Sequence, residues 1–198
     1  MVYDFIEIGT CDFDTLSEKA PPESVGLCIE PLKIYLDNIK AGPNVVKVNK
    51  AVSDRNGTAE IHYIKPEAIE EYGIHYGMKG CNSINNPHPT VKKILGDSYN
   101  KLTTTTLIEL TTWESLINDY QIKGIRYLKI DTEGHDDVVL GEYFKACENN
   151  KDLLAEEILF EYNTLTNIKN MDSIIEKFKK IGYKGIKLSD DYKLVRTN

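Results

Sequence analysis

The chain alternates short runs of apolar residues with stretches in which apolar residues recur at helical spacing. Short apolar runs indicate β-strands, and the longer spacing indicates helices with one buried face. The pattern predicts strands at residues 3–8, 25–29, 45–52, 58–64, 125–130, 157–162, 184–188 and 192–196. This alternation favours an α/β fold with a mostly parallel central sheet and helices on both faces.

Helix signals fall between these strands. One helix is expected to begin at Pro31, another after the capping-box pattern Thr111-x-x-Glu114, a third over 136–148, and the last to end at Gly182. The turn-like Ser189-Asp190-Asp191 joins the last two strands. We therefore expect an antiparallel hairpin at the C-terminal edge of the sheet.

Residues 65–100 interrupt this rhythm. They are rich in glycine, proline and asparagine and are too long for an ordinary connection. They are interpreted as a loop or lid inserted into a single domain that covers residues 1–198, and the alternative is a surface insertion without a role.

Charge and composition narrow the classes of partner. The formal net charge of −7 argues against nucleic acid, whose binding depends on lysine and arginine. No apolar run approaches the ~20 residues of a membrane-spanning helix, and the N-terminus lacks the pattern of a secretory signal. The four cysteines are far apart and show no CxxC spacing. We expect free thiols, a cytoplasmic location and no partner in the membrane.

The first predicted strand ends in a glycine loop, "DFIEIGTCDF". A dinucleotide-binding loop would read G-x-G-x-x-G, whereas this loop has Gly9, Cys11 and Asp14 at those positions. Carboxylates at Asp12 and Asp14 are expected to repel a pyrophosphate. A ligand without phosphate and with positive charge, such as S-adenosylmethionine, suits the loop better.

Glu30 lies 21 residues after Gly9, at the end of the second predicted strand. A carboxylate at this place commonly accepts hydrogen bonds from both ribose hydroxyls of a nucleotide cofactor. The alternative is an acid that stabilises the N-terminus of the following helix.

The segment "YLKIDTEGHD", 127–136, places Asp131, Glu133 and His135 after a buried strand. Two carboxylates and an imidazole at the ligand edge of a sheet indicate a functional site. The alternatives are a solvated turn, or a divalent-cation site formed by Asp131, Glu133 and Asp136.

Five segments together resemble the FkbM-type methyltransferases, in the same order along the chain. These are "IEIGTCDFDTL" at 6–16, "GLCIEP" at 26–31, "NKAVSDRNGTAEIHY" at 49–63, "LKIDTEGHDDVVLG" at 128–141 and "ILFEYN" at 158–163. The resemblance implies a Rossmann-like class I methyltransferase domain that uses S-adenosyl-L-methionine.

The resemblance also implies roles for individual residues. The methionine part of the cofactor would lie near Glu7, Gly9 and Thr10, and the ribose would bind Glu30. The adenine would lie against Ala51, Val52 and Ser53, with Asp54 as a partner for its amino group. Asp131 would lie near the methyl-transfer centre. Ala51 and Val52 are also explained as the buried end of a strand.

The function expected is O-methylation of a hydroxyl group on a small molecule or sugar, and the preference for oxygen comes from the resemblance alone. His135 and Asp131 are the candidates for a catalytic base. His75 and His88 lie in the 65–100 segment, where contact with substrate is an alternative to an ordinary loop position. A NAD-dependent oxidoreductase and a non-catalytic binding module that keeps the fold are the rival interpretations.

Overall fold

The computed structural model describes residues 1–85 and 88–197. Along the chain the elements are β1 (Val2–Ile8), α1 (Leu16–Lys19), β2 (Gly26–Ile29), α2 (Lys33–Leu36), β3 (Val45–Val48), β4 (Ala51–Val52), β5 (Gly57–Ile64), α3 (Pro66–Glu71), η1 (Tyr76–Gly80), α4 (Pro89–Leu95), η2 (Gly96–Ser98), α5 (Tyr99–Leu102), β6 (Thr103–Thr111), α6 (Trp113–Asp119), β7 (Gly124–Ile130), α7 (Asp136–Asn149), η3 (Lys151–Leu153), β8 (Glu157–Glu161), α8 (Ile168–Lys180), β9 (Tyr183–Lys187) and β10 (Asp191–Arg196).

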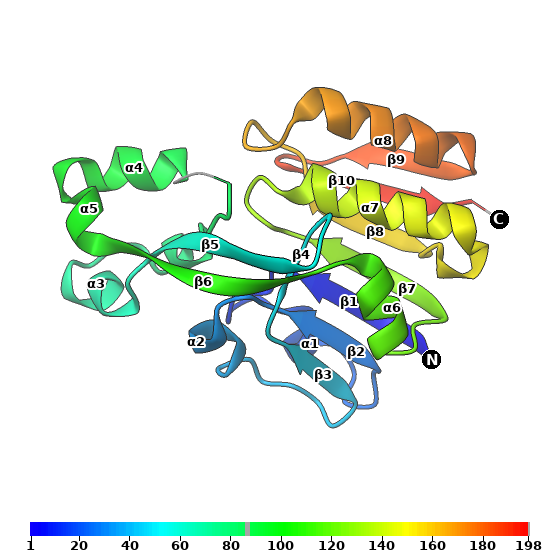
Figure 1. Ribbon diagram of the computed structural model, residues 1–198, viewed down its shortest axis with the longest axis horizontal. Helices are drawn as coiled ribbons and strands as arrows, with labels where there is room; N and C mark the ends of the chain where they lie inside the picture. The colour runs from blue at the N-terminus through cyan, green and yellow to red at the C-terminus, as the bar shows by residue number, and fades with distance from the viewer. Residues whose placement is uncertain (86–87, 198) are drawn as a thin grey trace.

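A seven-stranded sheet in the order β3-β2-β1-β7-β8-β10-β9 forms the centre of the protein (Figure 1). The pairs from β3 to β8 are parallel, whereas β10 is antiparallel to both β8 and β9. The predicted mostly parallel sheet and its C-terminal antiparallel hairpin are therefore confirmed. The strand order reverses between β1 and β7, and ligands of open parallel sheets bind at such a point.

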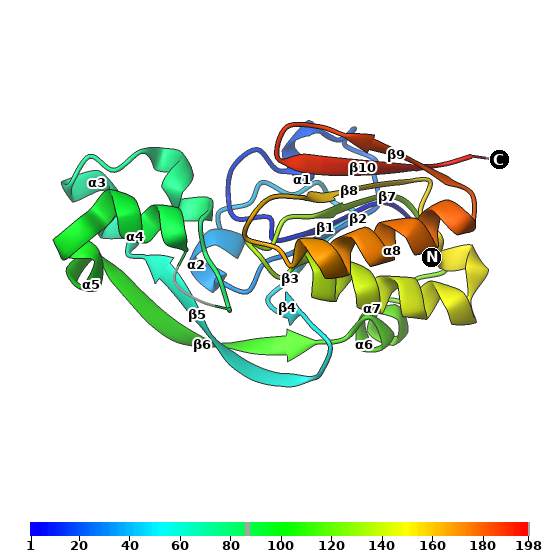
Figure 2. The same ribbon diagram turned by 90° about the horizontal axis from the view of Figure 1, so that it is seen from above.

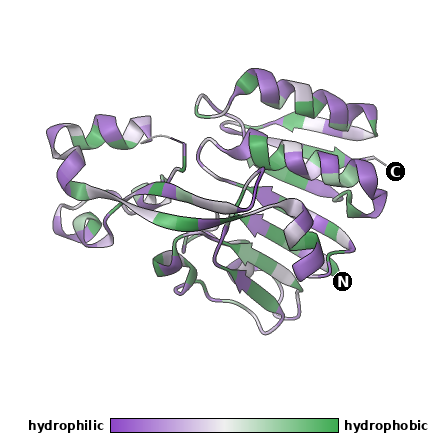
Figure 3. Ribbon diagram, viewed as in Figure 1, coloured by the Kyte–Doolittle hydropathy of each residue, from purple (hydrophilic) through white to green (hydrophobic). Residues whose placement is uncertain are grey.

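Helices cover the two faces of this sheet unequally (Figure 2). Helices α6, α7 and α8 bury the larger core on one face, around Trp113, Tyr143 and Phe178. The other face has a smaller cluster in which Phe5 and Cys28 pack with residues near α1 and α2. Figure 3 shows that α7 and α8 carry both hydrophilic and hydrophobic residues.

A second sheet, in the order β4-β6-β5, lies beside the first. The range 45–52, predicted as one strand, is instead split between the two sheets as β3 and β4. The break comes at Asn49, whose side-chain amide donates to the carbonyls of Glu30 and Pro31 at 3.0 and 2.8 Å. These bonds turn the chain out of the large sheet.

The β5–β6 ribbon carries residues 65–102, here called the helical insertion (left in Figure 1). The sequence predicts a loop in this region, but the structure has the short helices α3, η1, α4, η2 and α5, with residues 86 and 87 outside the described part. Pro66 and Pro89 begin two of these helices rather than breaking them. Apolar residues including Ile69, Met78 and Val91 give the insertion a small core of its own.

Two further helix predictions need correction. The helix expected from Pro31 is shorter, since α2 begins after Leu32 and ends at Leu36. Helix α6 is capped by Thr112 rather than Thr111, because the Thr112 hydroxyl accepts from the Ser115 amide. Within the described residues, no helix has both the length and the apolar character needed to cross a membrane.

The ends of β1 and β7 come into direct backbone contact. Gly9 has φ +80°, and a Cβ atom placed on it would lie 1.8 Å from the carbonyl oxygen of Asp131. Any side chain at this position would therefore force the two strand ends apart.

Replacing Gly9 with alanine is expected to reduce the free energy of unfolding by at least about 3 kcal/mol, because strain and a backbone clash add. Gly73→Ala is the matched control: Gly73 has φ +60°, but among the described residues nothing lies within 4 Å of the new methyl group. That control should lose only about 1–2 kcal/mol. Equal urea-denaturation losses in both variants would contradict the close approach.

Candidate functional site

A cleft lies at the carboxyl edge of the large sheet, at the reversal of strand order. It encloses about 510 Å³ of empty space, including open solvent at its mouth. Strand β4 contributes Ala51 and Val52, and the helical insertion closes one side with Gly80, Asn82 and Ile84. The loops that follow β1, β2 and β7 contribute Gly9, Cys11, Glu30, Asp131, Glu133 and His135. The structure therefore brings together most of the residues that the sequence assigns to a site.

The glycine loop has the backbone conformation of a glycine-rich loop, although two of the positions concerned are not glycine. Cys11 has φ +47° and Asp14 has φ +58°, both in the left-handed region that favours glycine. These are the two positions at which a dinucleotide-binding loop would repeat glycine. The loop thus resembles a glycine-rich loop in conformation, although Cys11, one of the residues that line the cleft, is not a glycine.

Glu30 is buried at the base of the cleft, and two backbone amides fix its carboxylate. Its carboxylate oxygens accept hydrogen bonds from the backbone amides of Cys11 and Leu32, each at 2.8 Å. Burial raises the pKa of Glu30 to about 7, although these two bonds oppose the shift. A carboxylate can accept about four hydrogen bonds, so further donors from a ligand can be accommodated.

Glu7, near the end of β1, and Thr10, within the glycine loop, are both buried and are not among the residues that line the cleft. The Glu7 carboxylate accepts from the Leu16 amide at 2.7 Å and pairs with Lys129 at 3.0 Å. Burial raises the pKa of Glu7, and Lys129 limits the shift. Lys129 also lies 3.7 Å from Asp131, so Glu7 supports the site through Lys129.

His135 closes the side of the cleft formed by β4. Its Nε2 lies 3.1 Å from the Ser53 hydroxyl, and its Nδ1 is buried without a hydrogen-bond partner among the described residues. Burial lowers the pKa of His135, which favours the neutral ring. Asp54, predicted to face the adenine, is instead exposed at a second hollow between α6 and α7 and pairs with Arg55.

Carboxylates converge where β7 and β8 end. Oxygen atoms of Asp131, Glu133 and Glu161 lie within 4.8 Å of one another. Burial and the neighbouring acids raise the pKa of Glu161 to about 9, and burial raises that of Asp131 to about 6. Glu161 received no role from the sequence, although its place at the end of the strand beside Asp131 could have indicated one.

Asp136, the third residue of the cation site considered from the sequence, does not belong to this group. Its carboxylate accepts from the hydroxyl and amide of Thr132 and from the amide of Glu161. Burial raises the pKa of Asp136 to about 7. Asp136 therefore fixes the turn after β7 against the end of β8.

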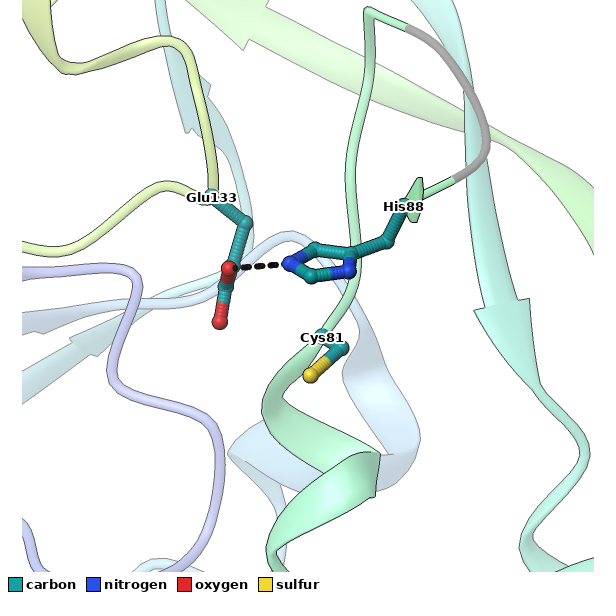
Figure 4. A group of neighbouring side chains, drawn as sticks. All are labelled: Cys81, His88 and Glu133. Carbon is teal, nitrogen blue, oxygen red and sulfur yellow. Dashed lines mark hydrogen bonds and ion pairs between the residues drawn. The ribbon is translucent and has the colours of Figure 1, made fainter. Parts of the chain in front are cut away.

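His88 joins the helical insertion to this turn (Figure 4). Its Nε2 lies 3.0 Å from a carboxylate oxygen of Glu133, while its Nδ1 accepts from the Thr90 amide at 3.2 Å. The second bond places the proton on Nε2, which then donates to Glu133 and has no lone pair for a metal.

Cys81 completes this group of three possible metal ligands. Burial raises the pKa of its thiol to about 12, so the thiol is protonated near neutral pH. Metals bind the thiolate. The contact that the structure shows within this group is the bond between His88 and Glu133, and a metal would have to displace the thiol proton of Cys81 to bind there.

In a comparison with protein families, the family model described as "Methyltransferase FkbM domain" matches residues 7–184. The match begins within β1 and ends in β9, so it includes every cleft residue described above. Comparisons with curated proteins and with solved structures gave no match.

The raised pKa of Glu161 makes stability depend on pH. An ordinary glutamate ionises near pH 4.3 in the unfolded chain, so between about pH 4 and 9 the folded protein holds a proton that the unfolded chain has lost. The free energy of unfolding then falls as the pH rises, by at most about 1.4 kcal/mol per pH unit for one proton.

We expect the urea midpoint to fall between pH 7 and pH 9, and Glu161→Gln to flatten this dependence. Glu176→Gln, an exposed carboxylate on α8, is the control and should keep the parental slope. The same slope in the Glu161 variant and the parent would show that Glu161 is ionised throughout this range.

Proposed function

The chain belongs to the FkbM methyltransferase family, and from this premise we propose that it transfers a methyl group from S-adenosylmethionine to a hydroxyl oxygen of a small molecule or sugar. The observation that carries the proposal is the cleft at the strand-order reversal, with Glu30 buried at the end of β2 and Gly9 at the end of β1.

The residues of the cleft suit this cofactor. Glu30 keeps acceptor capacity for two ribose hydroxyls, and Ala51 and Val52 offer an apolar surface to an adenine ring. His135 also lines the cleft, and its Nδ1 is a buried polar atom without a hydrogen-bond partner among the described residues. We assign the methionine part of the cofactor to the side of the cleft near Gly9 and Thr10. Glu7 would contribute indirectly, because it pairs with Lys129, which lies beside Asp131.

S-adenosylmethionine supplies an electrophilic methyl group on a sulfonium centre. Methyl transfer then depends mainly on alignment, to which Asp131 and the contact at Gly9 contribute by fixing the cleft wall. A hollow lined by Ser83, Asn85, His88, Glu133 and Thr164 adjoins the cleft and shares Glu133 with it. Its polar lining suits a hydroxyl-rich acceptor.

We assign the role of general base to His135. Its neutral form, which burial favours, can accept the hydroxyl proton at Nδ1. Glu133, held by His88, is the second candidate because it borders both the cleft and the acceptor hollow. Ser53 would keep the His135 ring in place during the transfer.

Nicotinamide-dependent oxidation is the rival function. The predicted repulsion between the loop acids and a pyrophosphate is weaker than the sequence suggests, because Asp12 pairs with Lys79 and Asp14 with Lys19. The argument against a dinucleotide now rests on Cys11 and Asp14, which stand where a dinucleotide-binding loop would repeat glycine.

Calorimetry is expected to show binding of S-adenosylhomocysteine, the demethylated product, and none of NAD. Glu30→Gln should weaken the nucleoside about tenfold to a hundredfold, because a charge-assisted bond contributes roughly 1.5–3 kcal/mol. Glu60→Gln removes an exposed carboxylate from β5 and serves as the control. Tight NAD binding with no heat from the nucleoside would reject the proposed function.

His135→Ala is expected to lower kcat by ~10²–10⁴-fold and to change the cofactor Kd far less. The acceptor for this assay would come from a screen of hydroxyl compounds and sugars with methyl-labelled S-adenosylmethionine. Parental turnover of the variant across pH 6–9 would remove His135 from the chemistry, and Glu133→Gln would then test the second candidate.

A further inference from the structure

Lys79 is a buried cation held in an aromatic enclosure. It lies in η1 of the helical insertion and is only 5% exposed. Its ammonium group pairs with the Asp12 carboxylate and with the Tyr76 hydroxyl. It also lies 3.5, 5.3 and 5.9 Å from the ring centres of Tyr76, Phe13 and Tyr35.

These partners come from three separate parts of the protein. Asp12 and Phe13 belong to the glycine loop after β1, Tyr35 belongs to α2, and Tyr76 belongs to the insertion itself. The Lys79 carbonyl adds a contact with the same loop, since it accepts from the Cys11 thiol at 3.7 Å. Lys79 is thus bonded to the glycine loop through both its side chain and its backbone.

The residues next to these contacts form the walls of the cleft. Cys11, which precedes Asp12, and Gly80, which follows Lys79, line the cleft. Gly80 also packs on the Phe13 ring, because a Cβ atom there would lie 3.1 Å from it. Asn82, another lining residue, donates to the Lys79 carbonyl at 2.7 Å. The insertion cannot leave the glycine loop without breaking the Lys79 contacts.

We propose that Lys79 is a positioning residue that fastens the helical insertion to the glycine loop and thereby limits the rate at which the nucleoside cofactor leaves the cleft. The inference rests on the proposed function for the identity of that ligand. A lysine that served only the stability of the insertion would change the free energy of unfolding and leave the release rate unaltered.

The burial of the pair determines the choice of variants. Lys79→Met leaves Asp12 uncompensated, and breaking a buried pair in this way is strongly destabilising. The double variant Asp12→Asn/Lys79→Met removes both charges together. Tyr76→Leu is milder, since Tyr76 is 58% exposed and its loss removes only one ring and one hydroxyl from the ammonium group.

Lys101→Met is the matched control. Lys101 also lies over a tyrosine ring, 4.9 Å from the centre of Tyr72, and contacts that tyrosine's hydroxyl. It belongs to the same insertion, but both partners of this contact lie within the insertion. The control therefore repeats the lysine–tyrosine chemistry without a link to the glycine loop.

Surface plasmon resonance with S-adenosylhomocysteine tests the release rate. The dissociation rate constant is expected to rise at least about tenfold in Lys79→Met and in the double variant, less in Tyr76→Leu, and not at all in Lys101→Met. Parental dissociation rates in the folded double variant and in Tyr76→Leu would overturn the proposal.

Hydrogen exchange of the ligand-free protein separates this inference from the proposed function. Amides of residues 76–84 should exchange faster in the Lys79 variants than in the parent or in Lys101→Met. If the parent protein fails to bind the nucleoside, the proposed function is rejected. The exchange rates of these amides then test by themselves whether Lys79 fastens the helical insertion to the glycine loop. Unchanged exchange would then overturn the role of Lys79.

Discussion

The backbone contact between Gly9 and Asp131 is the constraint from which the cleft takes its shape. It joins the ends of the two strands between which the strand order reverses, so the glycine loop must turn away from the sheet at once. That turn brings the Cys11 amide to Glu30. Beneath it, Lys129 lies between Glu7 and Asp131 and compensates acids on both strands.

Buried acids give the site its electrostatic character. Glu30, Asp136 and Glu161 all have raised pKa values, since burial disfavours their ionised forms. A ligand with positive charge would stabilise the ionised forms and would itself be attracted. The proposed sulfonium cofactor matches this environment, whereas a phosphate-bearing ligand would further disfavour the ionised forms.

The sequence alone predicts the parts of the fold that depend on local pattern. Strands β1, β2, β7, β8, β9 and β10 appear in it as apolar runs, and Glu30 and Asp131 follow from their places after such runs. It does not reveal where the chain changes sheets, because the break at Asn49 depends on carbonyls from another strand end. The sequence does not predict strand β6, because its run of threonines carries little apolar signal. The role of His88 depends on Glu133, which is 45 residues away in the sequence.

The position of β1 also affects how the protein can fold. On one side β1 pairs with β2, which follows it closely, but on the other its Glu7 faces Lys129 of β7, 122 residues later. During synthesis the central strand must therefore remain unpaired on one side until most of the chain has emerged. Such non-local pairing slows folding, and an open apolar strand edge promotes association between chains. The nascent chain is thus most vulnerable to aggregation before β7 appears.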